Sequence, residues 1–260
     1  TSATHVERFD ELGNLVWAKD ERGYITHHQY DVRGLRTATI QDVDDTQLTV
    51  PSGWSTPTGG GKHIVTDYET DDLGRVIQIL GPEHAINQQT VRTATWMVYD
   101  DVDHEVRTAK GYAVSDGQGG YTYTLVNPVT IRKSDSSGKV LEEIQATRAS
   151  TSGKLSASDT FAQSTYTRWT THHHNAYGQE TATRVYHTIP TSGAGSSGTN
   201  YDESTFGYDS RGRGNVTKTP GGTITRSVFD HLGNRTGEWI GTDDTDATDS
   251  DPTGTSATGN

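Results

Sequence analysis

The chain has 260 residues, of which 30% are hydrophobic, and its 34 acidic and 22 basic side chains leave a formal net charge of −12 at pH 7. No Lys/Arg-rich block offsets this acidic excess, so we expect no binding to nucleic acid or to an anionic membrane surface. The chain has no cysteine, which excludes disulfides and thiol catalysis.

The first pattern along the chain begins at Phe9 and returns near the other end. Each copy begins with an aromatic residue. Asp follows one position later, Gly follows four and fourteen positions later, and a second aromatic residue, itself followed by Asp, comes twenty-one positions later. A fixed period predicts a repeat architecture, in which each unit buries its apolar face on its neighbours. The copies are Phe9, Asp10, Gly13, Gly23, Tyr30 and Asp31, and then Tyr208, Asp209, Gly212, Gly222, Phe229 and Asp230.

The repeated Asp-x-x-Gly segment predicts a turn. Asp favours the first turn position because its carboxylate accepts backbone N–H groups, and Gly favours the position where a left-handed residue closes a hairpin. Residues 15–17 and 24–30, which flank turns in the first copy, hold aromatic and β-branched residues typical of strands. Each unit is therefore predicted to be a β-hairpin.

Weaker copies of the turn occupy the middle of the chain. Thr70, Ser134 and His174 replace the aromatic residue in three of them, and Asp103 occupies the Gly position of the turn after Tyr99. The predicted turn residues are Asp10 and Gly13, Asp31 and Gly34, Asp71 and Gly74, Asp135 and Gly138, Asn175 and Gly178, Asp209 and Gly212, and Asp230 and Gly233.

The segments 30–36, 208–213 and 229–235 resemble the Tyr-Asp-x-x-Gly-Arg/Asn core of the YD-repeat family, also called Rhs repeats. Members of that family include bacterial toxin shells, the C component of insecticidal Tc toxins, and teneurins. The resemblance implies an all-β fold, in which antiparallel hairpin repeats form a strip or a section of a β-shell. We expect the repeat region to span 1–242, with loop insertions near 51–61 and 190–198, followed by an acidic Gly/Thr-rich linker or tail at 243–260.

Two groups of side chains suggest metal ions. His172 and His174 share one face of a predicted strand, which suits metal ligation, although both also read as ordinary strand residues. The acidic tail presents oxygen ligands at near-alternating positions, and Ca²⁺ prefers such ligands. The candidate calcium ligands are Asp244, Asp246, Asp249 and Asp251, with a solvated linker as the alternative.

No motif specifies catalysis, so we expect no enzyme activity and no cofactor apart from the possible calcium. The sequence lacks a Gly-x-Ser-x-Gly elbow, a His-Glu-x-x-His segment and a phosphate-binding loop. Some members of the family carry a self-cleavage region, but Asp251-Pro252-Thr253-Gly254 is too weak a match for protease activity to be carried over.

Two classes of function remain open. The first is a structural role in a large secreted or cell-surface protein, including the wall of a toxin-encapsulating shell. The second is carbohydrate binding or adhesion, with exposed Trp54, Trp96, Trp169 and Trp239 stacking on sugar rings. Because the single methionine, Met97, is internal, we expect a longer polypeptide. We expect its remainder, or identical copies, to pair with the open edges of the sheet.

Overall fold

A computed structural model describes residues 4–248 and 250–252, and it confirms the predicted all-β class. Sixteen strands form one open antiparallel sheet in chain order, from β1 to β16. A single 3-10 turn, η1 (Gln163–Thr165), accompanies them in the part of the chain that is described. No helix in that part is long and apolar enough to cross a membrane.

The strands become longer toward the middle of the chain. Their bounds are β1 Val6–Phe9, β2 Leu15–Lys19, β3 Ile25–Tyr30, β4 Arg36–Gln41, β5 Ile64–Thr70, β6 Val76–Ile86, β7 Gln89–Asp100, β8 Glu105–Ser115, β9 Tyr121–Ser134, β10 Val140–Ala146, β11 Tyr166–His174, β12 Glu180–Tyr186, β13 Tyr201–Tyr208, β14 Gly214–Lys218, β15 Ile224–Phe229 and β16 Arg235–Gly241.

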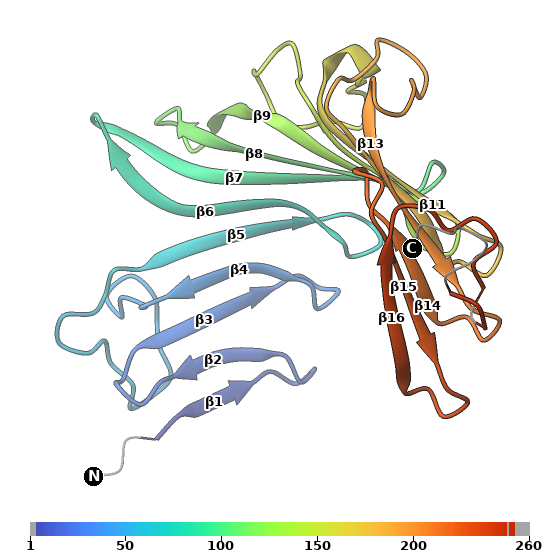
Figure 1. The fold of residues 1–260 in the computed structure, drawn as a ribbon. Coiled ribbons are helices and arrows are strands. Elements are labelled where there is room, and N and C mark those ends of the chain that lie inside the picture. The colour runs from blue at the N-terminus through green and yellow to red at the C-terminus, as the bar shows by residue number, and fades with distance from the viewer. Residues whose placement is uncertain (1–3, 249, 253–260) are drawn as a thin grey trace. The chain divides into compact units, whose positions relative to one another are not determined.

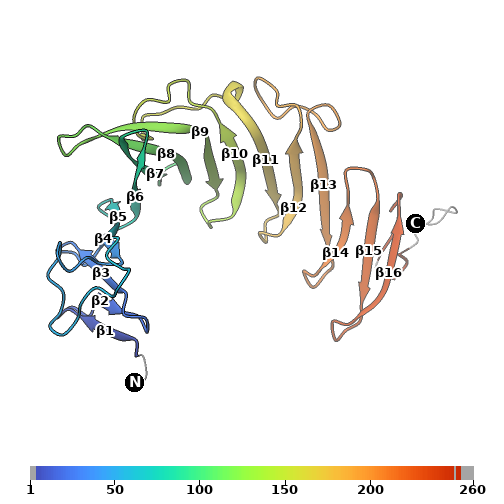
Figure 2. The ribbon, with the colours of Figure 1, turned by 90° about the vertical axis from the view of Figure 1, so that its left-hand side faces the viewer.

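The chain divides into two compact units. The first holds Thr1–Tyr99, Arg107–Val129 and Arg148–Asp159, and the second holds Asp100–Val106, Thr130–Thr147 and Thr160–Asn260. In the first unit β1 to β5 lie side by side in chain order (Figure 1), and in the second unit β11 to β16 do the same (Figure 2).

Each unit has its own apolar packing. In the first, Ile25, Ile40 and Val43 form a buried cluster against which Trp17 and Trp54 pack. Val43 belongs to the connection between β4 and β5, so part of this loop closes over the sheet. The segment 51–61 lies in the same connection, and 190–198 lies between β12 and β13; neither segment contains a strand.

In the second unit, aromatic rings pack across neighbouring strands. Trp169 of β11 stacks on Tyr186 of β12, with ring centroids 4.0 Å apart, and Tyr186 lies 5.2 Å from the ring of Tyr201 on β13. Cross-strand aromatic pairs of this kind stabilise a sheet beyond the area that they bury.

Candidate structural site: the turn edge

All eight turns that follow the aromatic positions lie at the same ends of the strands. Because neighbouring strands are antiparallel, the connections after β1, β3, β5, β7, β9, β11, β13 and β15 share an edge, which we call the turn edge. The remaining connections form the opposite edge, which we call the loop edge. The repeat pattern therefore marks one side of the sheet.

The turn between β1 and β2 shows how Asp and Gly act. Gly13 N donates to Asp10 O (3.1 Å), and Asp10 N donates to Asn14 O (3.0 Å). Asp10 Oδ1 accepts hydrogen bonds from the backbone N–H of Leu12 (2.9 Å) and of Asn14 (2.8 Å). Gly13 has φ +85°, a left-handed conformation that closes the hairpin with a bulge at Phe9.

The other predicted turns adopt the same arrangement. Asn175 replaces Asp and keeps both hydrogen bonds, since its Oδ1 accepts from the N–H of Tyr177 (2.9 Å) and of Gln179 (3.0 Å). The left-handed glycines are Gly13, Gly34, Gly74, Gly138, Gly178, Gly212 and Gly233, with φ between +75° and +94°.

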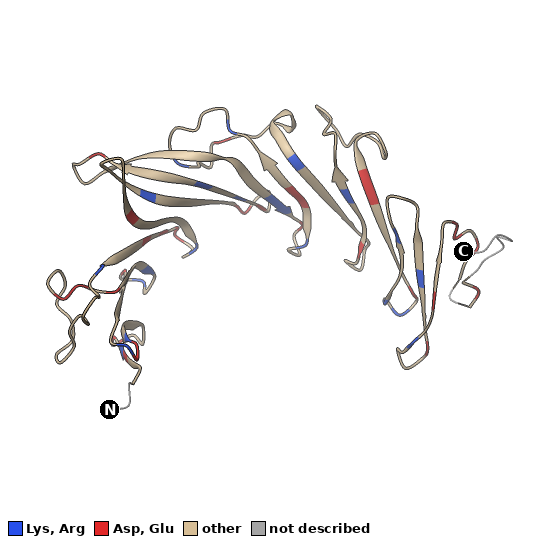
Figure 3. Ribbon diagram, turned by 60° about the vertical axis from the view of Figure 1, so that its left-hand side comes forward, with Lys and Arg blue, Asp and Glu red and all other residues tan. Residues whose placement is uncertain are grey.

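These hydrogen bonds and nearby cations favour the charged form of the turn carboxylates. The backbone N–H of Arg213 is the main reason why the pKa of Asp209 lies below its ordinary value, and the Arg213 guanidinium adds to the shift. For Asp10 the main cause of the lowered pKa is the side-chain amide of Asn14. Figure 3 shows acidic and basic positions side by side at several hairpin ends. In one such turn, Arg213 Nε lies 2.6 Å from Asp209 Oδ2.

The turn after Tyr99 departs from the prediction. The sequence places Asp103 in the Gly position, but the left-handed residue is His104, at φ +49°. Asp100 Oδ1 accepts from the N–H of both Val102 and Asp103 (3.1 Å each). The left-handed residue therefore lies one position later than in the other turns.

At three turns, the tyrosine in the aromatic position links the turn to the one before it. The tyrosine hydroxyl donates to the backbone oxygen of the residue five positions after the preceding turn's Asp or Asn, which is the first residue of a strand. The hydrogen bonds are Tyr30 Oη to Leu15 O (2.9 Å), Tyr99 Oη to Val76 O (3.1 Å) and Tyr208 Oη to Glu180 O (2.7 Å).

At five junctions, the residue after one turn glycine lies over the glycine of the next turn. A Cβ added to Gly212 would stand 3.1 Å from Gln179 Nε2, which also donates to Gly212 O (2.8 Å). The same relation joins Asn14 to Gly34, Leu35 to Gly74, Lys139 to Gly178 and Arg213 to Gly233. Gly138, which follows the irregular 100–104 turn, has no such neighbour within 4 Å. Glycine thus permits both the turn and its stacking.

Arginine side chains add further contacts between successive turns. The Arg75 guanidinium lies 4.3 Å from the Tyr99 ring centroid, and that of Arg213 lies 4.7 Å from Phe229. Arg211 Nη1 also donates to His231 O at 2.7 Å. Successive hairpins are joined by a repeated set of side-chain contacts in addition to their backbone ladders.

One register governs the pairing between successive hairpins. In six junctions the first residue pair joins the residue seven after one turn's Asp or Asn to the residue four before the next. The pairs are Trp17 with His27, Ala38 with Asp67, Gln78 with Trp96, Glu142 with Thr171, Ala182 with Thr205, and Val216 with Arg226.

Loop-edge connections differ in length at these junctions, from the short turn at 87–88 to the long loops 42–63 and 147–165. The constant register is therefore set by the turn edge and by the sheet faces, and not by the loops.

Loop-edge turns also use Asp that the repeat pattern did not single out. Asp20 Oδ1 accepts from the N–H of Arg22 (2.9 Å) and of Tyr24 (2.8 Å), and Asp116 acts likewise before Gly119. The spacing Asp20-x-x-Gly23 is the sequence signal that would have predicted the first of these two turns.

His172 has acidic partners on both neighbouring strands. Its Nδ1 lies 2.6 Å from Glu180 Oε1 on β12, and its Nε2 lies 3.9 Å from Glu143 Oε2 on β10. Burial raises the pKa of Glu180, but hydrogen bonds from Thr183 and His172 outweigh this, and the net pKa is lowered. His172 and His174 line the same hollow, as predicted for one strand face, yet no three metal-binding side chains in the described residues are grouped to hold an ion.

The candidate calcium ligands fall partly outside the described residues, since Asp249 is one of them. Around it, Asp243 Oδ1 accepts from Thr245 N (3.0 Å), and Ala247 N donates to Asp244 O (3.0 Å). Calcium binding by this segment stays a prediction.

Two of the four tryptophans expected to be exposed are buried, which corrects that expectation. Trp96 is 2% exposed because Gly111 on β8 leaves room for its indole, and Trp169 is 9% exposed in the stack with Tyr186. Trp54 is half-buried beneath the cation of Lys19, 5.1 Å from its ring centroid.

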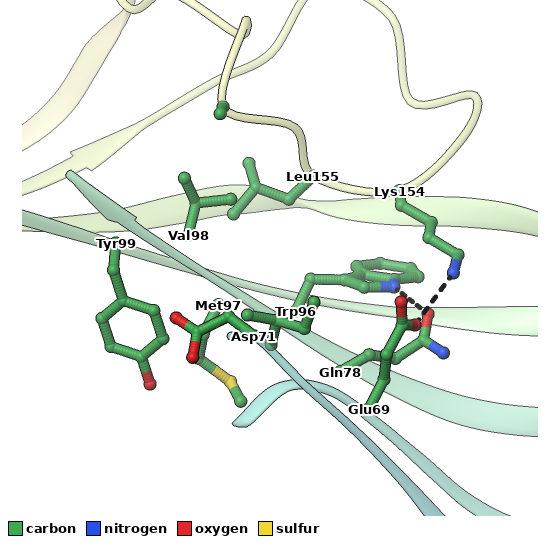
Figure 4. A pocket seen from close by; sticks show the side chains of 11 residues that line it. Glu69, Asp71, Gln78, Trp96, Met97, Val98, Tyr99, Lys154 and Leu155 are labelled. Carbon is green, nitrogen blue, oxygen red and sulfur yellow. Dashed lines mark hydrogen bonds and ion pairs between the residues drawn. The ribbon is translucent and has the colours of Figure 1, made fainter. Parts of the chain in front are cut away.

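A hollow of about 270 Å³ lies beside Trp96 (Figure 4). Its polar lining is internally paired: Trp96 Nε1 donates to Gln78 Oε1 (3.0 Å), and Lys154 Nζ lies 3.5 Å from Glu69 Oε2. The four polar groups that these two contacts join therefore have partners within the lining itself.

Comparison with known proteins leaves the family open. No family model and no curated protein matches the sequence. Solved structures of TcdB2-TccC3-TEV and TcdB2-TccC3 match with 16% and 14% identity and TM-scores of 0.25 and 0.26, over 92% of this chain. The chain spans 14% of the length of those solved chains. Likenesses with such TM-scores do not establish kinship.

Proposed function

We propose that the chain is a structural section of a YD-repeat protein, forming part of a β-shell or of an elongated assembly outside the cell. The supporting observation is the turn edge, where the repeated aromatic, Asp and Gly residues link successive hairpins, as in the Tyr208–Glu180 hydrogen bond of 2.7 Å. Residues used in this way build a sheet of fixed register. In this proposal the sheet is the functional part, and the chain performs no chemistry.

We further propose that the outer edges of β1 and β16 pair with additional strands. Each is the terminal strand in the sheet order, and free edge N–H and C=O groups pair readily with another strand. The remainder of the same polypeptide is the preferred partner, and identical copies are the alternative. A toxin-encapsulating wall is one form of this role.

Electron microscopy of the native polypeptide that carries this sequence tests the proposal. We expect these strands within a larger sheet, with further strands beside β1 or β16. A discrete particle in which both edges are exposed to solvent would refute the structural role proposed here.

A further inference from the structure

A hollow of about 320 Å³ lies on β9, β10 and β11, which are neighbours in the sheet (Figure 2). Its lining includes Arg132 of β9 and Arg168 of β11. Both residues are exposed, and neither side chain makes an ion pair or a hydrogen bond with another residue in the part of the chain that the structure describes. Two guanidinium groups without an acidic partner therefore line one hollow.

Other arginines of the sheet are paired with carboxylates. Arg92 Nη1 lies 2.6 Å from Asp67 Oδ2, and Arg184 Nε lies 2.5 Å from Glu203 Oε2. Acidic side chains outnumber basic ones in this chain, 34 to 22, so carboxylate partners are plentiful. Two unpaired guanidiniums at one hollow therefore point to an anion from outside the chain.

Strand alternation brings further polar groups to the same hollow. Residues two apart on a strand share a face of the sheet, and in the pairing of β10 with β11 Glu143 is opposite Thr170 and Gln145 is opposite Arg168. All the polar lining residues belong to the second unit. They are Thr130 and Arg132 of β9, Glu143 and Gln145 of β10, and Arg168 and Thr170 of β11.

The chemistry of this lining fits a sugar that carries a carboxylate. A guanidinium presents parallel N–H donors that match a carboxylate. The hydroxyls of Thr130 and Thr170, the amide of Gln145 and the carboxylate of Glu143 are suited to pair with sugar hydroxyls. The volume lies near the lower end of the range of about 300–1,000 Å³ that is typical of small-molecule sites.

The same lining argues against a nucleotide as the anion. A nucleobase is usually held by stacking on an aromatic ring. Among the described residues that line the hollow, none is aromatic. The lining therefore has groups for a carboxylate and for hydroxyls, and no platform for a base.

We propose that this hollow binds an acidic sugar, such as a uronic acid, with Arg132 and Arg168 donating to its carboxylate and Glu143 and Gln145 pairing with its hydroxyls. Because one strand separates β9 from β11, the two strands lie about 10 Å apart, and the guanidiniums can approach one ligand from opposite sides. The proposal does not depend on the structural role proposed above, since the hollow lies on a sheet face and not at the turn edge.

NMR titration of the ¹⁵N-labelled chain with glucuronate tests the proposal. At about 0.15 M salt the Debye length is about 8 Å, so repulsion from distant acidic groups is screened more than contacts within the hollow. We expect saturable shifts of the Nε–H signals of Arg132 and Arg168. Arg132→Gln and Arg168→Gln should each weaken binding several-fold, and the double variant should abolish it. Arg132→Lys, which keeps the charge but loses the parallel donors, should bind with intermediate affinity.

Arg22→Gln provides the matched control. Arg22 is also exposed, and its side chain makes no ion pair or hydrogen bond with another described residue, but it lies on a loop-edge turn away from the hollow. This variant should bind glucuronate as the unmodified chain does. Equal thermal unfolding midpoints of all variants would show that weaker binding is not a loss of folding.

Two further ligands separate the parts of the proposal. Glucose lacks the carboxylate and acetate lacks the hydroxyls, so each should bind several-fold more weakly than glucuronate. Unchanged binding by the double variant, or glucose bound as tightly as glucuronate, would overturn the proposal. Acetate bound as tightly would show a simple anion site and would overturn the assignment to a sugar. None of these outcomes bears on strand pairing, so the proposed structural function is tested separately by microscopy.

Discussion

A turn glycine at this edge meets two demands at once, a left-handed backbone and close approach of a neighbouring side chain. Gly212 has φ +79°, and its missing Cβ leaves space for Gln179. We expect Gly212→Val to lower the free energy of unfolding by about 1 kcal/mol or more, and Gly212→Asn to lower it less. Urea unfolding measures the difference.

A matched control is available in the same hairpin region. Gly221 has no left-handed φ, and its nearest neighbour to an added Cβ is at 4.0 Å. Gly221→Ala should therefore leave the stability unchanged or raise it slightly. A Gly212→Val protein as stable as the Gly221→Ala protein would contradict the steric account.

The irregular turn at 100–104 reverses the usual expectation for glycine. Because His104, and not Asp103, is left-handed at φ +49°, we expect His104→Gly to raise the free energy of unfolding by on the order of 0.5 kcal/mol. Asp103→Gly should give no gain. Thermal unfolding of the two variants distinguishes the positions, and a gain for Asp103→Gly alone would be evidence against the assignment.

The hydroxyl group of Tyr208 contributes to stability separately from its ring. Tyr208→Phe removes the donor to Glu180 O (2.7 Å) and should cost about 0.5–1.5 kcal/mol of unfolding free energy. Tyr177, which is 88% exposed at a turn tip, provides the control, and Tyr177→Phe should be neutral. Equal effects of the two substitutions on stability would show that the hydrogen bond of the Tyr208 hydroxyl does not stabilise the fold.

At the scale of elements, hairpins and the joints between them differ in how far a sequence predicts them. The hairpin at Asp10 follows from local chemistry, because Asp and Gly act within five residues. The register between hairpins depends on contacts such as Tyr208 with Glu180, 28 positions apart, and no local pattern specifies them. Likewise, His172 meets Glu143 only through strand pairing.

Burial of aromatic residues was the other failure of prediction. Trp96 and Trp169 have the alternation of strand residues, and this does not tell which face is covered. The structure covers Trp96 because Gly111 on another strand has no side chain, a complementarity that a single strand cannot reveal.

The long loops should act as appendages of a continuous ladder. We expect proteolysis within 190–198 to leave both fragments associated in native buffer, because β12 and β13 pair from Ala182 opposite Thr205 to Tyr186 opposite Tyr201. Gel filtration after nicking tests this. Separation into two folded halves would show that the loop, and not the strand pair, holds the hairpins together.

At the scale of the whole chain, protonation acts through two groups of side chains. Burial lowers the pKa of His27, His28 and His173, so their neutral forms favour folding. The pKa of turn carboxylates such as Asp209 is also lowered, so their charged forms favour folding. In both groups the stabilising contribution is present above the unfolded-state pKa and is lost as the pH falls through the folded-state pKa.

We therefore expect the free energy of unfolding to decline in two stages. The first begins as the pH falls below about 6.5, the ordinary pKa of His, and the second begins below about 3.9, that of Asp. Asp209→Asn should make the second stage smaller, since Asn175 shows that an amide keeps the backbone bonds without titrating. His27→Gln should make only the first stage smaller. Urea unfolding measured across pH 3 to 8 decides, and a stability that rises on acidification through both windows would contradict these pKa directions.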